Sequence, residues 1–407
     1  MVTAWFKAAP PFRPGARLFI MSYSLSRFAL MGGNFVTGLA VLAPAGMLHD
    51  LSQGLGVSIR EAGLLVTYGA IVLCISSPVM SWLTTRIGRR FLLVGTLSIL
   101  AVGHIACAFL DSYSAVLALR IAMMSVAAIF TPQAASTIAL IVPQNVRASS
   151  LAFVFLGWSM AIAVGLPIVT LLATQFGWRQ TFLAIGIAAA IAALANVVTL
   201  PRGLRGPQLS LQSFAQIASN KTLVLVLLIT LFQMSGQFTI TIYMAPVLQS
   251  LAGAGPAITG AFFSIFGGAS VIGNMTATRI VGRFGVPLTL TLCMVSMIIG
   301  ALIWATGGGM LPVMAVGVFL IGLGATSANS MQQARLIEVM PALASATVAL
   351  NTSFLYFGQG LGSGSAGILY ERGHVHAIGF LAVVFFVLSF VTFRITEYWR
   401  QRALSKP

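Results

Sequence analysis

Long apolar stretches alternate with short polar segments along almost the whole chain. Each stretch is about 20 residues long, the length that an α-helix needs to cross the hydrocarbon core of a bilayer. We therefore expect twelve transmembrane helices. The first six cover residues 25–47, 62–83, 91–110, 115–138, 150–173 and 180–199. The second six cover residues 223–249, 257–278, 287–306, 310–331, 345–368 and 376–395.

A polar segment separates the first six stretches from the second six. It holds two prolines and three basic residues and is typical of a linker between domains. We expect an N-terminal arm at 1–24, a six-helix bundle at 25–199, this linker at 200–221, a second six-helix bundle at 222–395 and a tail at 396–407.

The composition also indicates a membrane protein. Hydrophobic residues make up 58% of the 407 residues, charged residues only 7%, and the mean hydropathy is +0.99. Soluble domains carry about 25% charged residues, so this chain lacks the polar surface that water requires. Helices satisfy their own backbone hydrogen bonds in hydrocarbon, and we therefore expect an all-α integral membrane protein.

The net charge of +16 is distributed as the predicted topology requires. Eighteen basic residues fall on the side that holds both termini and the linker, Arg120 lies within a span, and three lie on the other side: Arg60, Arg179 and Arg372. Basic residues concentrate in cytoplasmic loops, so both termini are expected in the cytoplasm and the protein in the bacterial inner membrane. The basic residues form no continuous face, which argues against a nucleic-acid partner.

Cysteine and metal chemistry contribute little to this picture. Cys74, Cys107 and Cys293 lie far apart inside apolar segments and are interpreted as small buried hydrophobic residues. The sequence has no cluster of histidine, cysteine and carboxylate residues typical of a metal centre, and we expect no metal and no cofactor.

Two cationic turns occupy matching points in the two halves of the chain. Thr85-Arg86-Ile87-Gly88-Arg89-Arg90 follows the second span, and Gly282-Arg283-Phe284-Gly285 lies about 197 residues later, after the eighth span. A membrane protein with two similar halves of this kind is typical of secondary transporters.

These turns and four further motifs resemble the major facilitator superfamily, and within it the twelve-span drug:proton antiporters that include the bacterial arabinose and sugar efflux permeases. The turns are similar to the family's loop signature between spans two and three and to its counterpart in the second half. The further motifs are Arg120, Gly157 to Gly165-Leu166-Pro167, Gly177-Trp178-Arg179 with Phe182, and Gln332-Gln333-Ala334-Arg335 with Asn351 and Gly358. The resemblance implies two pseudo-symmetric six-helix bundles, the major facilitator fold, and a monomer.

Two departures from the family pattern concern acidic residues. The loop signature normally has an aspartate before its arginine, and the resemblance implies that this aspartate holds the loop against the opposite bundle. Here Thr85 and Gly282 stand at those positions. Many proton-coupled relatives carry an acid in span one, where this chain has Asn34-Phe35-Val36-Thr37-Gly38.

No carboxylate lies deep within a predicted span. The six are Asp50, Glu61, Asp111, Glu338, Glu371 and Glu397, all in loops or at span ends. Proton-driven antiport usually needs a titratable group inside the membrane. His104 in span three and Glu61 at the start of span two are the candidate proton switches. The alternatives are a histidine bonded to a neighbouring helix, a solvated acid at a helix start, and transport without a coupling ion.

Arg120, which the topology places within a span, is the most informative single charge. An arginine there costs about 2.5–3.5 kcal/mol, so it should face a wet cavity or bond to backbone carbonyl groups. Two roles are open, attraction of an anionic or strongly polar substrate group and a structural tie between spans four and one. Without a nearby carboxylate, Arg120 gives the cavity a positive potential, which disfavours organic cations.

Polar residues concentrate on spans one, four, seven and ten, which the resemblance implies line a central cavity. We expect the substrate cavity to be lined by Asn34, Thr37, Arg120, Thr131, Gln233, Gln237, Thr241, Tyr243, Asn329, Gln333 and, from span eleven, Asn351. Amides and hydroxyls suit a sugar, a nucleoside or a neutral amphiphile. Hydrogen bonding between helices is the alternative role for these side chains.

Five arginines in the cationic turns form a predicted cytoplasmic gate: Arg86, Arg89, Arg90, Arg279 and Arg283. The positive-inside rule explains most of them. Their matching positions also suggest contacts with helix C-termini of the opposite bundle, which would form and break as the access state changes.

The sequence therefore predicts a secondary transporter that exports small polar or amphiphilic organic molecules by alternating access, with protons as the candidate coupling ion. The alternative is an uncoupled facilitator or an importer of an organic anion. An enzyme or a receptor is not expected, because the sequence has no deep catalytic constellation and no large soluble domain.

Overall fold

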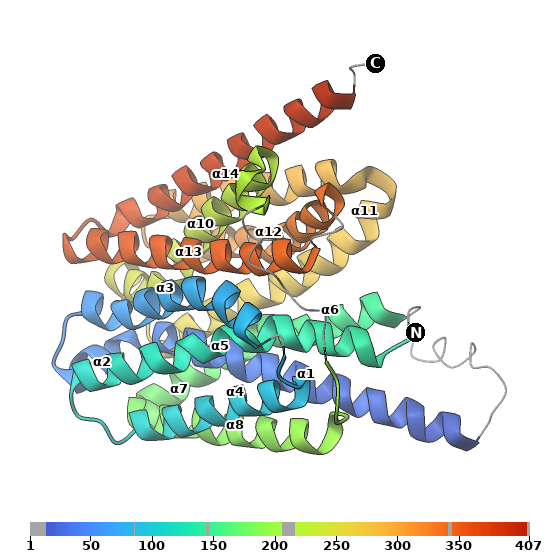
Figure 1. The fold of residues 1–407 in the computed structure, drawn as a ribbon. Coiled ribbons are helices and arrows are strands. Elements are labelled where there is room, and N and C mark those ends of the chain that lie inside the picture. The colour runs from blue at the N-terminus through green and yellow to red at the C-terminus, as the bar shows by residue number, and fades with distance from the viewer. Residues whose placement is uncertain (1–13, 85, 144–145, 206–215, 341–343, 405–407) are drawn as a thin grey trace.

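The computed structural model describes residues 14–84, 86–143, 146–205, 216–340 and 344–404, and the regular elements in these ranges are all helices (Figure 1). The first half contains α1 (Pro14–Gly46), α2 (Leu48–Leu55), α3 (Ile59–Leu83), α4 (Arg89–Cys107), α5 (Tyr113–Ile141), α6 (Arg147–Met160), η3 (Ala161–Gly165), α7 (Leu166–Phe176) and α8 (Trp178–Thr199). The second half contains α10 (Lys221–Ala252), α11 (Pro256–Thr306), α12 (Leu311–Val339), α13 (Ala344–Glu371) and α14 (Val375–Leu404).

Helix α11 consists of two membrane-spanning helices in sequence. Gly285 interrupts its helical backbone at φ 75° and ψ 167°, a conformation that glycine adopts without strain. It lies 197 residues after Gly88, which precedes the first turn of α4, so the two halves turn at equivalent positions. With α11 counted twice and α6, η3 and α7 counted as one, the described helices supply the twelve predicted spans.

Ten helical segments of the described chain, with α11 counted once, are long and apolar enough to cross a membrane. Helix α13, which is rich in glycine and serine, is the remaining span. Large apolar side chains cover the outer surface: Val102, Val198 and Val384 are each more than half exposed. Exposure of such apolar side chains to water is unfavourable, so this surface is expected to lie in the hydrocarbon of a bilayer.

The fifth span changes its hydrogen-bond pattern at its middle. A π-helical turn, η3, joins α6 to α7 immediately before Pro167. Pro167 has no N–H to donate to the carbonyl of Ala163, four residues earlier. Instead, the hydroxyl of Ser264 on α11 donates to that carbonyl at 2.9 Å. The proline thus leaves an acceptor for a contact between the two bundles.

Helical structure extends further at the two termini than the sequence predicts. Residues 14–24, predicted as part of an arm, form the first turns of α1, and residues 396–404, predicted as a tail, continue α14. The short helix α2 is also unpredicted, and it buries Leu48 and Leu51. The rest of the predicted arm and tail lies outside the described residues.

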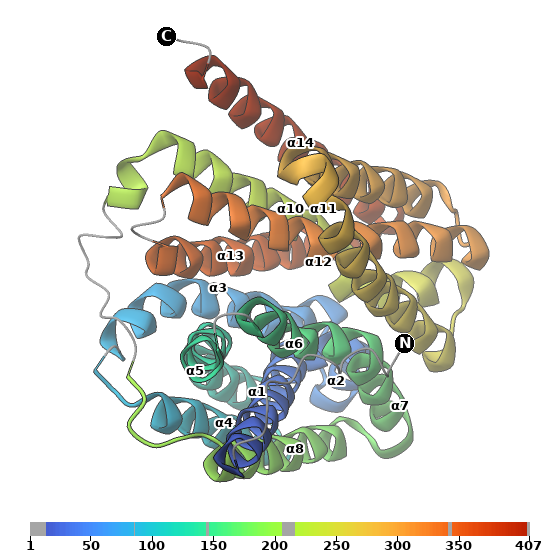
Figure 2. The same ribbon diagram turned by 90° about the vertical axis from the view of Figure 1, so that its right-hand side faces the viewer.

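The helices form two bundles that lie side by side with their helices running in a shared general direction (Figures 1 and 2). Helices α1 to α8 form the first bundle and α10 to α14 the second. The described chain begins and ends at the end of the molecule where α3 ends, α4 begins and α8 ends, which we call the linker end. We call the opposite end, where α1 and α13 end, the far end. Helices α4 and α8 lie at the outer edge of the first bundle.

Contacts between the bundles are prominent toward the far end. Arg60 on α3 forms an ion pair with Glu371 on α13. Deeper along the same two helices, the hydroxyl of Thr67 donates to that of Ser363 at 2.9 Å. Gly267 on α11 lies so close to Ala163 that an added Cβ would clash with its backbone. Together with the Ser264 hydrogen bond, these contacts join the bundles in this half of the interface.

Candidate functional site

In the first bundle, three polar side chains tie α1, α5 and α6 together. The Thr131 hydroxyl donates to Asn34 Oδ1 at 2.8 Å, and Trp158 Nε1 donates to the Thr131 oxygen at 3.0 Å. Asn34 also donates through Nδ2 to the carbonyl of Val154 at 3.0 Å. We name Asn34, Thr131 and Trp158 the first triad. Asn34 is fully buried, whereas Thr131 remains partly exposed.

The second bundle contains a similar arrangement on α10, α12 and α13. The Thr230 hydroxyl donates to Asn351 Oδ1 at 2.7 Å, and Asn351 Nδ2 donates to Asn329 Oδ1 at 3.5 Å. We name Thr230, Asn329 and Asn351 the second triad. Asn351 is fully buried and Asn329 is partly exposed.

The two triads lie at equivalent points of the internal repeat. A shift of 197 residues carries Asn34, Thr131 and Trp158 to positions 231, 328 and 355, each within about one helical turn of a member of the second triad. The structure therefore brings together four of the predicted cavity residues, in two pairs. It adds Trp158 and Thr230, which the sequence prediction missed and which the repeat offset could have located.

Helix α10 carries two amide oxygens that have no hydrogen-bond partner among the described residues, those of Gln233 and Gln237. The two residues are four apart and share one face of the helix. Gln233 donates through Nε2 to the carbonyl of Ala325 on α12 at 3.0 Å, which fixes its orientation. Buried polar atoms are nearly always bonded, so these two oxygens indicate a place for donors from water or a ligand.

The other predicted cavity residues have different surroundings. Thr37 and Thr241 donate to carbonyls of their own helices, those of Gly33 (2.8 Å) and Gln237 (2.9 Å). Gln333 is partly exposed on α12, one turn beyond Asn329.

Tyr243, also predicted to line the cavity, belongs to the far-end contacts. Its ring lies 5.8 Å from that of Tyr370 on α13. Its hydroxyl lies against Gly63 of α3 and Gly367 of α13, where an added Cβ would clash with it. Tyr243 therefore packs between helices of both bundles.

Arg120 makes the hydrogen bonds of a structural tie between α5 and α1. Its Nη2 donates to the carbonyls of Ala40 (3.3 Å) and Val41 (3.4 Å). Pro44 lies inside α1 and has no N–H for the Ala40 carbonyl, so Arg120 supplies the missing donor. The side chain is 1% exposed, and its Nε and Nη1 have no partner within the described part of the chain.

Glu61 takes the position of its structural alternative, an acid at a helix start, whereas the hydrogen bond of His104 is to its own helix and not to a neighbouring one. His104 is fully buried, its Nδ1 donates to the Leu100 carbonyl of its own helix at 2.8 Å, and its ring lies edge-on to Phe182. Glu61 is in a capping box at the start of α3: its Oε2 accepts from the Ser58 N–H at 2.8 Å, and its N–H donates to the Ser58 hydroxyl at 3.1 Å.

Most of the other described carboxylates are in ion pairs. Asp111 accepts from Arg179 at 2.6 Å at the far end, where Glu371 also pairs with Arg60. Glu397, near the end of α14, is almost fully buried and accepts from Arg335 (2.7 Å) and Arg400 (3.2 Å). Asp50, in α2 outside the spans, is partly buried, and burial raises the pKa of its carboxyl. The side chain of Glu338 lies outside the described residues.

The structure places the predicted gate arginines at the linker end without an ion pair between the bundles among the described residues. Arg86, Arg279 and Arg283 are exposed, and Arg283 lies over the ring of the adjacent Phe284. Arg89 is buried at the start of α4, and its N–H donates to the carbonyl of Leu204 at 2.9 Å. The loop at the start of α4 is thereby bound to the segment that follows α8.

The fold, the internal repeat and the paired polar clusters define a membrane transporter of two pseudo-symmetric bundles. The chain belongs to the Major Facilitator Superfamily, whose family model matches residues 30–362. This match confirms the family and the all-α, twelve-helix fold predicted from the sequence.

Bacterial transporter sequences are similar to this chain over most of its length. It is 25% identical over 375 residues to "Uncharacterized MFS-type transporter YbcL" of Bacillus subtilis, covering 91% of this chain and 95% of that protein. It is 26% identical over 367 residues to "Probable sugar efflux transporter" of Mannheimia succiniciproducens, covering 88% of this chain and 92% of that protein.

A solved structure has the same fold. It is a bacterial homolog of the human lysosomal transporter Spinster in an inward-facing and unoccupied conformation, with a TM-score of 0.66 and 16% sequence identity. The likeness covers 95% of this chain and 98% of that one.

The tie between Arg120 and the Ala40 carbonyl can be tested with a double-mutant cycle. We expect Arg120→Ala to lower the free energy of unfolding by about 1–3 kcal/mol, because a buried acceptor loses its donor. In a Pro44→Ala background the restored N–H of residue 44 bonds to the Ala40 carbonyl, and Arg120→Ala should cost less. Unfolding of the purified protein in detergent measures both costs.

The matched background is Pro78→Ala, which removes a proline from inside α3 instead of α1. Arg120→Ala should cost the same there as in the natural chain. An equal cost of Arg120→Ala with and without Pro44 would contradict the tie.

Proposed function

We propose that the protein exports small, uncharged polar or amphiphilic organic molecules across the bacterial inner membrane by alternating access between its two bundles. The observation that carries this proposal is the pair of unpartnered amide oxygens of Gln233 and Gln237 on α10. A sugar or nucleoside hydroxyl is a donor that matches an amide oxygen, and binding of such a donor removes the cost of leaving the oxygen unpaired.

The two triads support the same substrate class. Thr131 and Trp158 are partly exposed in the first triad, and Asn329 is partly exposed in the second. These side chains can offer both donors and acceptors from opposite bundles to one ligand, as alternating access requires. The similarity to a probable sugar efflux transporter agrees with a substrate rich in hydroxyl groups.

An organic anion is a weaker candidate substrate, because the case for it depends on Arg120 as the group that attracts it. The guanidinium of Arg120 already donates to two backbone carbonyls and is almost fully buried. Its Nη2 holds α5 against α1, so an anion would have to bind through the buried Nε and Nη1, which have no partner among the described residues.

The distribution of basic residues supports an orientation with the linker end in the cytoplasm. Eighteen basic residues belong to that side and three, Arg60, Arg179 and Arg372, to the far side. The far end is then periplasmic, and the ion pair of Arg60 with Glu371 helps to close the interface there. We infer that this conformation gives access from the cytoplasm.

A second candidate function is uncoupled, downhill transport of the same molecules. This candidate is favoured because these described carboxylates already have hydrogen-bond or ion-pair partners. Glu61 caps a helix, and Asp111, Glu371 and Glu397 are in ion pairs. A proton carrier must release such bonds in each cycle. Exchange against protons remains the first candidate for the driving force, with His104 as the buried titratable group.

Transport into proteoliposomes, with and without an imposed pH gradient, tests these functions. We expect a labelled neutral sugar or nucleoside to enter protein-containing vesicles faster than empty ones. Accumulation above the external concentration only with a pH gradient supports proton exchange, whereas equilibration alone supports the second candidate. Movement of organic anions but not of neutral polar solutes would overturn both.

Gln237→Met removes the amide oxygen at nearly constant side-chain volume. We expect the apparent substrate affinity to fall by about 3- to 10-fold, the value of one hydrogen bond to an uncharged group. Ser235→Ala is the matched control, because the Ser235 hydroxyl donates to the Leu231 carbonyl of its own helix at 2.9 Å. An equal effect of both substitutions would contradict a binding role for Gln237.

Reversing one charge of the far-end ion pair should favour the opposite access state. In Arg60→Glu, two carboxylates face each other at the far end. The readout is the rate at which an external, membrane-impermeant maleimide labels the protein at Ser363→Cys, and we expect this rate to rise about two- to fivefold. Adding Glu371→Arg should restore the original rate. Arg179→Glu, which breaks an ion pair inside the first bundle at the same end, should leave labelling unchanged. A higher labelling rate in Arg179→Glu but not in Arg60→Glu would contradict the role of the Arg60–Glu371 ion pair in closing the far end.

A further inference from the structure

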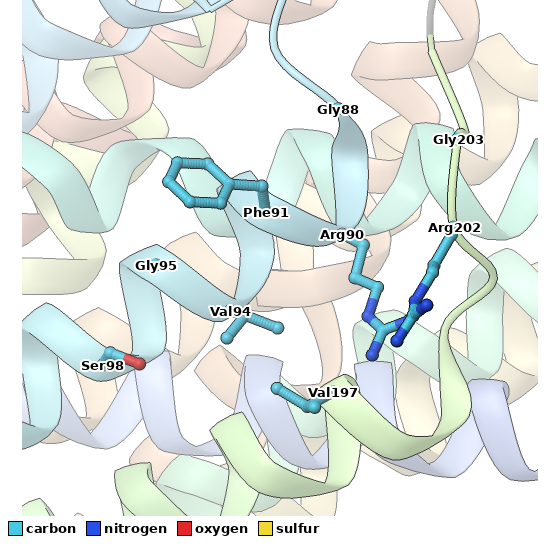
Figure 3. Close-up of a pocket in the computed structure, with 9 residues that line it drawn as sticks. All are labelled: Gly88, Arg90, Phe91, Val94, Gly95, Ser98, Val197, Arg202 and Gly203. Carbon is cyan, nitrogen blue, oxygen red and sulfur yellow. The ribbon is translucent and has the colours of Figure 1, made fainter.

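A groove opens on the outer face of the first bundle, between α4 and α8 at the linker end. Its volume is about 520 Å³, within the range of small-ligand sites. Figure 3 shows Arg90 and Arg202 at one end, with their guanidinium groups close together. The remainder is mostly apolar and includes Phe91, Val94 and Val197. The groove is thus cationic at one end and hydrophobic along its length.

The long axis of the groove follows α4 from the helix start toward the membrane interior. Arg90 lies in the first turn of α4 and Arg202 lies three residues after the end of α8, so both cations are at the membrane interface. Ser98, another lining residue, lies about 12 Å further along the helix axis. Phe91 is 74% exposed on the outer surface. An occupant would therefore have its head group at the interface and an apolar chain in the hydrocarbon.

The charge of the groove selects an anionic head group. The residues that line it include no carboxylate, and neither Arg90 nor Arg202 forms an ion pair within the described ranges. Two guanidinium groups repel each other unless an anion lies between them. Their fork-shaped donor sets match phosphate oxygens, and the positive end of the α4 dipole lies beside them.

We propose that this groove binds an anionic phospholipid of the phosphatidylglycerol type. Its phosphodiester lies between Arg90 and Arg202, and one acyl chain lies over Phe91, Val94 and Val197. The bound lipid connects the start of α4 to the segment after α8, next to the backbone hydrogen bond from Arg89 to Leu204. This site is outside the interface between the bundles and does not depend on the transported substrate.

Native mass spectrometry of the detergent-purified chain, titrated with phosphatidylglycerol, phosphatidylcholine or inorganic phosphate, tests the proposal. Phosphatidylglycerol should bind at least about tenfold more tightly than phosphatidylcholine. Arg90→Gln and Arg202→Gln should each weaken it about fivefold. Arg205→Gln is the matched control, since Arg205 is exposed in the same segment but does not line the groove.

Gly95→Phe tests the apolar part of the groove with both arginines present. An added Cβ at Gly95 meets no atom within 4 Å, so a ring can enter the groove without disturbing the helix. Phosphatidylglycerol binding should fall, and inorganic phosphate should compete poorly in the natural chain. Equal binding by the natural chain and the arginine variants, equal binding of the two lipids, or full competition by phosphate would overturn the proposal.

Discussion

A backbone carbonyl that loses its helical donor inside a bilayer has no water to replace it, and an unpaired group there costs several kcal/mol. Prolines create two such carbonyls at important points of this molecule. Pro44 frees the carbonyl of Ala40, which accepts from Arg120 on α5. Pro167 frees that of Ala163, which accepts from Ser264 on α11. One proline thus positions two helices within a bundle, and the other positions one bundle against its neighbour.

The same rule separates structural polar groups from those available to a ligand. Asn34, Thr131 and Trp158 satisfy one another across three helices, and the second triad does so at the equivalent place. Such bonds keep each bundle rigid, which rocking of one bundle against the other requires. On α10, the amide oxygens of Gln233 and Gln237 have no such partner among the described residues. Unpaired acceptors are costly in a finished fold, and under the proposed function a hydroxyl of the substrate would donate to them.

Hydropathy and the distribution of basic residues were sufficient to predict the twelve helices and most span limits, because these depend on local sequence. The family was predicted from the resemblance of its motifs. The contacts of Arg120 required more. Pro44 follows Ala40 by four residues, so the free carbonyl is visible in the sequence, but its meeting with α5 is a tertiary event. The pairing of Arg60 with Glu371, 311 residues apart, has no local signal. Trp158 was missed because tryptophan in a span is usually read as apolar.

The buried charge of Arg120 connects the fold to substrate choice. Both hydrogen bonds to the Ala40 and Val41 carbonyls come from the one Nη2 group of Arg120, which the long side chain carries from α5 to α1. The cost is a full positive charge in the first bundle, with no carboxylate beside it among the described residues. The positive charge of Arg120 repels cations even though its Nη2 is hydrogen-bonded to carbonyl groups. This repulsion does not imply that the substrate is an anion. Under the proposed function, a neutral molecule with hydroxyl groups avoids that penalty and can donate to the unpaired oxygens of Gln233 and Gln237.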